Sequence, residues 1–160
     1  MPADVVTAHA KLTLTLRVTG VRADGYHLID AEMVSLDLAD TLTIDPAGDG
    51  LEVRGAGAHV EVDDDNLVRR ALRAAGRTAH VVLDKRIPAG AGLGGGSADA
   101  AAVLRWAGVT DLELAAGIGA DVAFCLVGGR ARVRGIGEVV DPLPFEPRAF
   151  TLLTPPVHCS

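Results

Sequence analysis

Residues 88–102 read PAGAGLGGGSADAAA, and this stretch decides which fold we expect. Five of the seven residues from Gly90 to Gly96 are glycine, and an alanine-rich segment of helical character begins at Ser97. The preceding run AHVVLD, residues 79–84, predicts a strand. Glycine lets the backbone approach an anion closely, and the free N–H groups of a first helical turn point at such a ligand. The order strand, glycine loop and helix therefore predicts a phosphate-binding loop for a nucleoside triphosphate.

Two better-known glycine motifs do not fit this stretch. The P-loop requires a lysine directly before its serine or threonine, and no lysine precedes Ser97. The dinucleotide-binding fingerprint requires an acidic residue at a strand end about 20 residues further on. Asp111 and Glu113 lie near that distance, but they fall in a predicted helix. A plain glycine-rich surface turn is the remaining alternative, and the flanking strand and helix favour the binding loop over it.

Composition bounds the class of protein. The chain has 160 residues, enough for one domain with its own core, and its 49% hydrophobic content excludes a disordered chain. A net charge of −6 argues against a nucleic-acid-binding surface. No apolar run is long enough for a membrane span or a signal peptide. The two cysteines, Cys125 and Cys159, form no disulfide framework or metal-binding spacing, so we expect a cytoplasmic protein.

Hydrophobic patterning predicts many strands and few helices. The predicted strands are residues 5–17, 29–36, 40–44, 51–54, 58–62, 79–84, 122–127, 131–134, 138–140 and 150–154. Residues 51–54 and 58–62 are expected to form a hairpin, and residues 19–27 a loop. The predicted helices are about 66–75, with Asn66 as its N-cap, about 97–106, and 111–116 behind Asp111. Because helices and strands do not alternate strictly, the fold class is α+β rather than a doubly wound parallel sheet.

Several segments occur in an order that resembles the GHMP kinase superfamily. They are AKL at residues 10–12, RADGYH at 22–27, DNL at 65–67, KRIP at 85–88, the glycine loop, and GADVAF at 119–124. The glycine loop alone indicates only the superfamily, whereas RADGYH selects the 4-diphosphocytidyl-2-C-methyl-D-erythritol kinases within it. The resemblance covers residues 8 to about 155. It implies the GHMP kinase N-terminal domain, which is similar to the second domain of ribosomal protein S5, with mixed or antiparallel sheets and a few helices.

The resemblance implies a reaction and two catalytic residues. The reaction is the ATP-dependent phosphorylation of the 2-hydroxyl of 4-diphosphocytidyl-2-C-methyl-D-erythritol, with Mg²⁺, in non-mevalonate isoprenoid biosynthesis. Asp121, expected at the start of a strand, matches the family's catalytic aspartate and would accept the hydroxyl proton or only orient the hydroxyl group. Lys11 would keep that carboxylate ionised and offset charge on the transferred phosphoryl group. Taken singly, Lys11 is equally a solvated lysine and Asp121 a turn or cap residue.

The resemblance also implies residues for the two ligands. Tyr26 would stack on the cytosine base, and His27 would pair with its edge. The Ser97 hydroxyl would reach a phosphate or, through Mg-ATP, the metal ion. The nucleotide-binding residues that it implies are Asn66, Leu67, Lys85, Pro88, Gly90, Gly92, Gly94, Gly95, Gly96 and Ser97. Asn66 has a structural alternative, because it also suits a helix cap.

Two departures from the family pattern shape our expectations. The family normally has a second domain, and we expect residues 1–160 to form only the N-terminal, ATP-binding domain. We therefore expect weak or no turnover. We also expect self-association through apolar surface that the second domain would cover. Thr13 stands where the family commonly has asparagine, which puts that substrate contact in question. Two other functions remain open: another GHMP small-molecule kinase, such as a homoserine or mevalonate kinase, and a non-catalytic nucleotide-binding or interaction domain.

Overall fold

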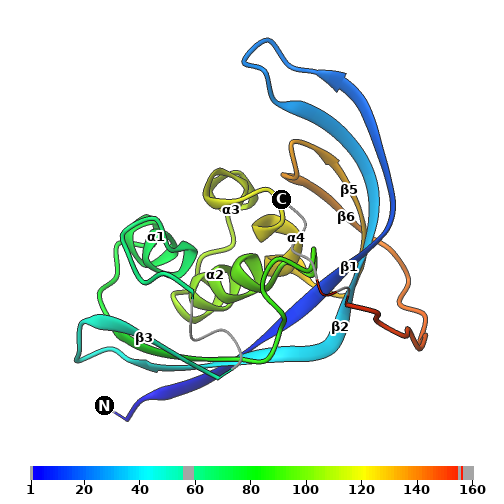
Figure 1. Ribbon diagram of the computed structural model, residues 1–160. Helices are drawn as coiled ribbons and strands as arrows, with labels where there is room; N and C mark the ends of the chain where they lie inside the picture. The colour runs from blue at the N-terminus through cyan, green and yellow to red at the C-terminus, as the bar shows by residue number, and fades with distance from the viewer. Residues whose placement is uncertain (1, 56–59, 155, 157–160) are drawn as a thin grey trace.

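The computed structural model describes residues 2–55, 60–154 and 156, and within them the chain forms one bent sheet with helices on one face (Figure 1). The strands are β1 (Asp4–Val21), β2 (His27–Asp45), β3 (Gly50–Gly55), β4 (His80–Lys85), β5 (Arg130–Gly135) and β6 (Val139–Pro142). The helices are α1 (Leu67–Ala74), α2 (Gly95–Trp106), α3 (Leu112–Ile118) and α4 (Val122–Val127). None of the described helices is long and apolar enough to cross a membrane.

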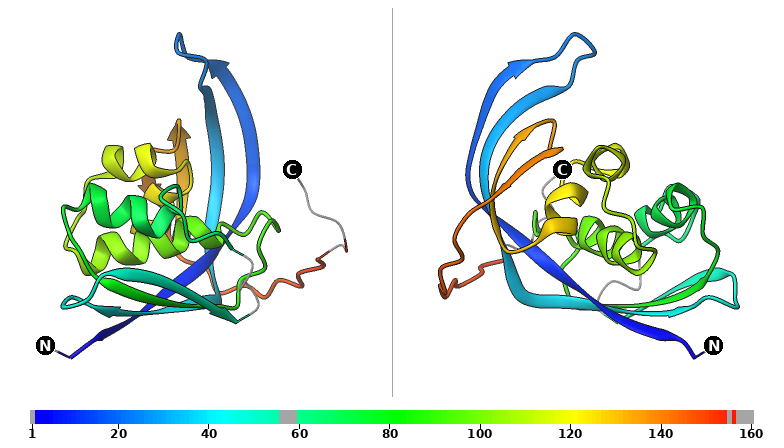
Figure 2. Two further views of the ribbon diagram at one scale, coloured as in Figure 1. Left: turned by 60° about the vertical axis from the view of Figure 1, so that its left-hand side comes forward. Right: turned by 180° about the vertical axis from the view of Figure 1, so that it is seen from behind.

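Strand β2 organises the sheet. One of its edges pairs with β1 in an antiparallel hairpin that runs from Asp4 opposite Ile44 to Val21 opposite His27. Its other edge is shared, because residues 41–45 pair with β4 and residues 29–34 pair with β5. The sheet therefore bends along β2, with β3 and β4 at one end and β5 and β6 at the other (Figures 1 and 2). The register of β1 shifts at three places, and the first shift, between His9 and Lys11, directly precedes the lysine of interest.

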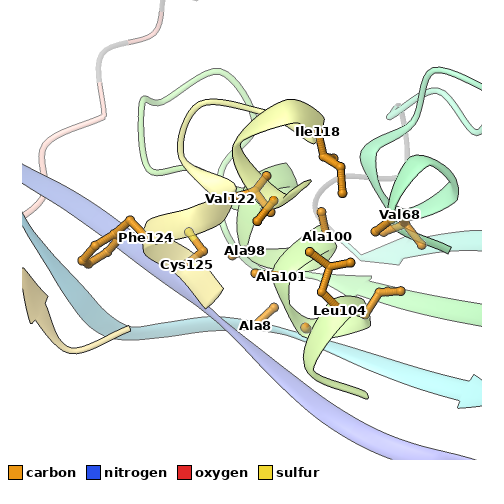
Figure 3. Packing of buried hydrophobic residues seen from close by; sticks show 14 of the residues in the cluster. Ala8, Val68, Ala98, Ala100, Ala101, Leu104, Ile118, Val122, Phe124 and Cys125 are labelled. Atoms are coloured by element: carbon orange, nitrogen blue, oxygen red, sulfur yellow. The ribbon is translucent and has the colours of Figure 1, made fainter. Parts of the chain in front are cut away.

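The core lies between the sheet and the helices. Helix α2 is rich in alanine. Its small buried residues Ala98 and Ala101 let β1 and α4 approach it closely, and Ala100 faces Val68 of α1 and Ile118 of α3 (Figure 3). Larger side chains, Leu104 of α2 and Phe124 of α4, fill the remaining volume and are fully buried. This packing holds the N-terminal end of α2, where the glycine loop ends, in a fixed position against the sheet.

The prediction of a strand at residues 122–127 was wrong, because this run forms helix α4. The six residues VAFCLV are apolar throughout, and a short apolar run fits a buried strand and a buried helix equally well. The helix begins after Asp121 and ends at Gly128, which has a positive φ of 71°. Asp121 therefore precedes a helix rather than beginning a strand. Cys125 in this helix is buried, and burial raises the pKa of its thiol to about 12.

Other predicted boundaries were wrong at the edges of the sheet. Residues 29–36 and 40–44 belong to the single strand β2, and residues 19–21 of the predicted loop belong to β1. Strand β3 pairs in parallel with β4 instead of forming the predicted hairpin with residues 58–62. Residues 60–62 are not a strand, and residues 58–59 lie outside the described residues. Residues 150–154 form no strand either. They belong to a C-terminal stretch that runs along the sheet face opposite the helices (Figure 2). Cys159 lies outside the described residues.

Candidate active site

The glycine loop joins the end of β4 to the start of α2 and borders a cavity of about 450 Å³. Helix α2 begins two residues earlier than predicted, at Gly95, and its N-cap is Gly94. Gly94 has a φ of 66°, and a Cβ at this residue would lie 2.8 Å from Cγ of Lys11. Only glycine meets both demands, the left-handed backbone and the close approach of the lysine.

The first turn of α2 leaves backbone donors free in a position suited to an anion. The first N–H groups of a helix have no intrahelical partner, and the helix dipole adds positive potential there. Within the described residues no side chain caps α2, whereas Asn66 caps α1 and Asp111 caps α3. The first intrahelical hydrogen bond joins the Ala98 N–H to the Gly94 carbonyl. This end of α2 can therefore accept a phosphate group without displacing a protein cap.

Lys11 and Asp121, the two predicted catalytic residues, meet beside this loop. The Nζ atom of Lys11 lies 3.2 Å from Oδ2 of Asp121 and donates a hydrogen bond of 3.1 Å to the Thr13 hydroxyl. The backbone N–H of Lys11 donates to the Leu93 carbonyl at 2.9 Å, so β1 is tied directly to the glycine loop. The lysine is buried, while the Asp121 side chain keeps 29% of its surface exposed and accessible to a substrate. Thr13 thus supports the lysine from the position where the family commonly has asparagine.

The loop that carries Asp121 is supported from the turn between β5 and β6. A Cβ at Gly137 would collide with the carbonyl oxygen of Ala120, the residue before Asp121. On the other side, a Cβ at Gly119 would lie 3.8 Å from the Ser97 hydroxyl. The start of α2 and the loop before α4 are therefore neighbours, with Ser97 facing Gly119.

The predicted nucleotide-binding residues gather around one cavity. All of them except Ser97 line it, which brings together the start of α1, the end of β4 and the glycine loop. Asn66 also fills its structural role: its Oδ1 accepts a hydrogen bond from the Val68 N–H at 2.9 Å, and its Nδ2 donates to the Glu61 carbonyl at 2.8 Å. Leu67 packs near Gly96, where a Cβ would lie 3.4 Å from its Cδ1.

Lys85 differs from the other cavity residues because its ammonium group is buried between two carboxylates. Nζ lies 2.5 Å from Oδ2 of Asp40 and 2.9 Å from Oδ2 of Asp99. Burial lowers the pKa of Lys85, but the two aspartates outweigh it and the net pKa is raised. For Asp99, burial raises the pKa to about 7 although Lys85 lowers it. Sequence reasoning missed Asp40 and Asp99. Asp40 is one of several acidic residues in β2, so nothing marked it as buried, and the only signal for Asp99 was its place in an alanine-rich run.

Tyr26 and His27 stand apart from the other predicted residues. They follow the turn at the far end of the β1–β2 hairpin, which extends beyond the helices (Figure 1). The Tyr26 side chain is exposed, and the Arg22 guanidinium lies 5.5 Å from the centre of its ring. Arg22 also forms an ion pair with Asp24, whose Oδ1 accepts a hydrogen bond from the Tyr26 N–H. The hairpin tip is thus an ordered turn that presents one aromatic ring to solvent, and the structure does not bring it into contact with Lys11 or Asp121.

Comparison with known proteins shows which families and proteins this chain resembles. A family model described as the GHMP kinases N terminal domain matches residues 66–129. The chain is 49% identical over 150 residues to the 4-diphosphocytidyl-2-C-methyl-D-erythritol kinase of Paracoccus denitrificans (strain Pd 1222), a match that covers 93% of this chain and 55% of that protein. It is 42% identical over 168 residues to the kinase of the same name from Neisseria meningitidis serogroup A (strain Z2491), covering 96% of this chain and 60% of that protein.

Solved structures show the same likeness in three dimensions. A crystal structure of 4-(cytidine 5'-diphospho)-2C-methyl-D-erythritol kinase superposes with a TM-score of 0.68 at 41% identity, covering 88% of this chain and 55% of that one. The mevalonate kinase of Methanococcus jannaschii superposes with a TM-score of 0.60 at 12% identity and shows a shared fold alone. The chain thus spans little more than half the length of the curated relatives that it matches.

Proposed function

We propose that this chain binds ATP in the glycine-loop cavity and serves phosphoryl transfer to the 2-hydroxyl of 4-diphosphocytidyl-2-C-methyl-D-erythritol. It would do so as the N-terminal domain of a 4-diphosphocytidyl-2-C-methyl-D-erythritol kinase, a member of the GHMP kinases. The observation that carries the proposal is the Lys11–Asp121 pair, 3.2 Å apart and tied to the glycine loop by the Lys11 N–H. Phosphoryl transfer requires a cradled triphosphate, an oriented alcohol and compensation of the transferred charge. The loop, Asp121 and Lys11 supply these three parts in one place.

The reaction assigns a separate task to each of the two charged residues. Asp121 accepts a hydrogen bond from the substrate hydroxyl and receives its proton as the oxygen bonds to the γ-phosphorus of ATP and ADP leaves. Lys11 keeps Asp121 ionised and offsets negative charge on the transferred group. Mg²⁺ would arrive with ATP, held by its phosphates, and the Ser97 hydroxyl would be a ligand for it. We further propose a cytoplasmic location, where ATP is available.

The exposed ring of Tyr26 supports the choice of substrate. An open aromatic face stacks well on a nucleobase, and His27 beside it offers donors and acceptors for the edge of cytosine. Homoserine and mevalonate contain no base, so a kinase of either would have no use for this pair.

Turnover with three alcohols tests the proposal. The chain is incubated with ATP, Mg²⁺ and either 4-diphosphocytidyl-2-C-methyl-D-erythritol, homoserine or mevalonate, and ADP is followed. We expect slow turnover with the first alcohol only, because the chain spans little more than half of its relatives' length. Asp121→Asn should lower this rate by about 10²- to 10⁴-fold and leave ATP binding intact. Faster ADP release with homoserine or mevalonate would contradict the substrate assignment.

The uncapped start of α2 beside the cavity would also serve a second candidate, a nucleotide-binding domain without its own turnover. Calorimetry distinguishes it from the kinase: ATP and CDP would bind, no ADP would form with any of the three alcohols, and Asp121→Asn would change neither affinity.

A further inference from the structure

The glycine loop rests on three buried charged side chains that come from three different elements. Asp40 belongs to β2, Lys85 to β4 and Asp99 to α2, and their exposed fractions are 0%, 4% and 2%. Removing three charges from water is costly unless each one is paired and hydrogen-bonded. We therefore asked what this buried group, here called the loop clamp, holds in place.

One side of the loop clamp fixes the point where the chain enters the glycine loop. Asp40 uses its two carboxylate oxygens differently. Oδ2 lies 2.5 Å from Nζ of Lys85, while Oδ1 accepts the backbone N–H groups of Arg86 at 2.5 Å and Ile87 at 2.8 Å. These two residues directly follow β4 and lead into the loop. The backbone is thus tied to β2 at the place where the strand ends.

The other side fixes the point where the loop becomes helix α2. Oδ2 of Asp99, in the second turn of the helix, lies 2.9 Å from the same Lys85 ammonium. A Cβ at Gly95, the first residue of α2, would lie 2.9 Å from that nitrogen, so the ammonium group sits directly beneath the helix start. One lysine therefore connects both ends of the glycine loop.

We propose that Asp40, Lys85 and Asp99 position the glycine loop for the phosphates of the nucleotide, and that Lys85 acts through the loop rather than by touching the nucleotide. With two donors engaged by carboxylates and 4% of the residue exposed, Lys85 offers no free surface to a ligand in the cavity that it borders. The inference rests on the proposed function for the identity of the ligand, but the positioning of the loop can be measured without any ligand.

Amide hydrogen exchange of the free chain is the first measurement. Two reporter amides report the loop position: the Lys11 N–H, bonded to the Leu93 carbonyl, and the Ala98 N–H, bonded to the Gly94 carbonyl. In Lys85→Met and Asp99→Ala we expect both to exchange about tenfold faster or more, because the loop loses one anchor. Asp99→Asn, which keeps the shape and a polar group, should rescue slow exchange. Asp84→Asn, an exposed change on the neighbouring residue, serves as the matched control.

Unchanged exchange of both reporter amides in Lys85→Met and Asp99→Ala would overturn the proposal. Far-UV circular dichroism identifies any variant that fails to fold. Asp99→Ala leaves the Asp40–Lys85 pair in place, so it carries the test if Lys85→Met does not fold.

Calorimetry with three probes then asks how Lys85 affects binding. If Lys85 positions the loop, Lys85→Met should weaken Mg-ATP and tripolyphosphate by a similar factor, about tenfold, and leave adenosine unchanged. Weaker adenosine binding with unchanged tripolyphosphate binding would show that Lys85 touches the nucleoside, and the proposal would be wrong. If the wild-type chain binds none of the probes, the proposed function fails, while hydrogen exchange still decides whether the clamp holds the loop.

Discussion

At the scale of single residues, Gly94 shows how a missing side chain shapes the site. Its left-handed backbone turns the chain into helix α2, and its lack of a Cβ lets the Lys11 side chain cross beneath the loop toward Asp121. Gly92 has a similar φ of 72° but has open space where a Cβ would be. Comparing the two glycines therefore distinguishes the free-energy cost of a side chain in the left-handed conformation from the cost of its contact with Lys11.

Substituting each glycine by alanine measures these two costs. Gly92→Ala should lower the free energy of unfolding by about 1–2 kcal/mol, the cost of a side chain in the left-handed region. Gly94→Ala should lose about 1–3 kcal/mol more, because the new methyl group displaces Lys11. Urea unfolding followed by circular dichroism gives both values. Equal losses would mean that Lys11 moves aside freely and that its position is less constrained than the structure indicates.

At this scale the glycine loop was predictable from the residues and the Lys11–Asp121 pair from the family resemblance, whereas the charged residues beneath the loop were not predictable. The glycine loop lies in a motif whose chemistry can be read from residue type and spacing, whereas Lys11 and Asp121 were implied by the family resemblance. Asp40 and Asp99 depend on a contact between residues 40, 85 and 99, and a sequence does not show which distant charges are buried together. Thr13 was noted only as a departure from a family pattern, and the structure shows that its hydroxyl accepts a hydrogen bond from Lys11.

At the scale of elements, prediction succeeded where local signals were complete. Asn66 and Gly76 delimit α1, and the six residues of β4 alternate between buried and more exposed positions. Prediction failed for α4, because VAFCLV is apolar on every face and both periods fit it. The strand predicted at residues 51–54 was confirmed as β3, but its predicted hairpin was wrong. Parallel pairing with β4 joins segments about 30 residues apart and leaves no turn signal between them.

Helix α1 offers a test of whether Asn66 serves the fold, the ligand or both. Asn66→Ala should lower the free energy of unfolding by about 1 kcal/mol, because the Val68 N–H loses its cap. Asn66→Asp keeps an acceptor at the N-cap and should retain stability. Urea unfolding together with ATP calorimetry checks this. If Asn66→Asp retains stability and also full ATP affinity, the amide has no ligand-binding role of its own.

At the scale of the whole molecule, the loop clamp makes stability depend on pH. Asp99 faces Lys85 from β4 and Asp40 from β2, and burial raises its pKa to about 7. A carboxyl group whose pKa is raised by folding stabilises the folded state most below its unfolded pKa, near 4, and loses this contribution as pH rises through 7. The free energy of unfolding should therefore decrease between about pH 4 and pH 7 in the wild type. It should decrease less in Asp99→Asn, and parallel urea-unfolding profiles of the two proteins would contradict the assignment.

The hairpin arm makes a second prediction about the whole molecule. Its apolar side chains Leu16, Val18 and Val21 are each more than half exposed, beside the exposed Tyr26. We expect this surface to drive concentration-dependent self-association, measured by sedimentation velocity. Replacing Leu16 and Val18 by threonine, a β-branched residue that favours strands, removes apolar surface and should shift the protein toward monomer. Val5→Thr, an exposed change at the other end of β1, is the control, and an equal shift there would exclude the arm as the contact.

The shared edge of β2 also has a consequence for how the chain is made. Residues 29–34 of β2 pair with β5, whose residues lie about a hundred positions later in the chain. At a synthesis rate of about 5–20 residues per second, this edge stays open for about 5–20 s on the ribosome. During that interval the nascent hairpin presents unpaired backbone groups to other chains. Slower translation between residues 35 and 130 should therefore lower the yield of folded protein. Strand β2 thus joins the two halves of the sheet and also determines how long the nascent chain is prone to aggregate.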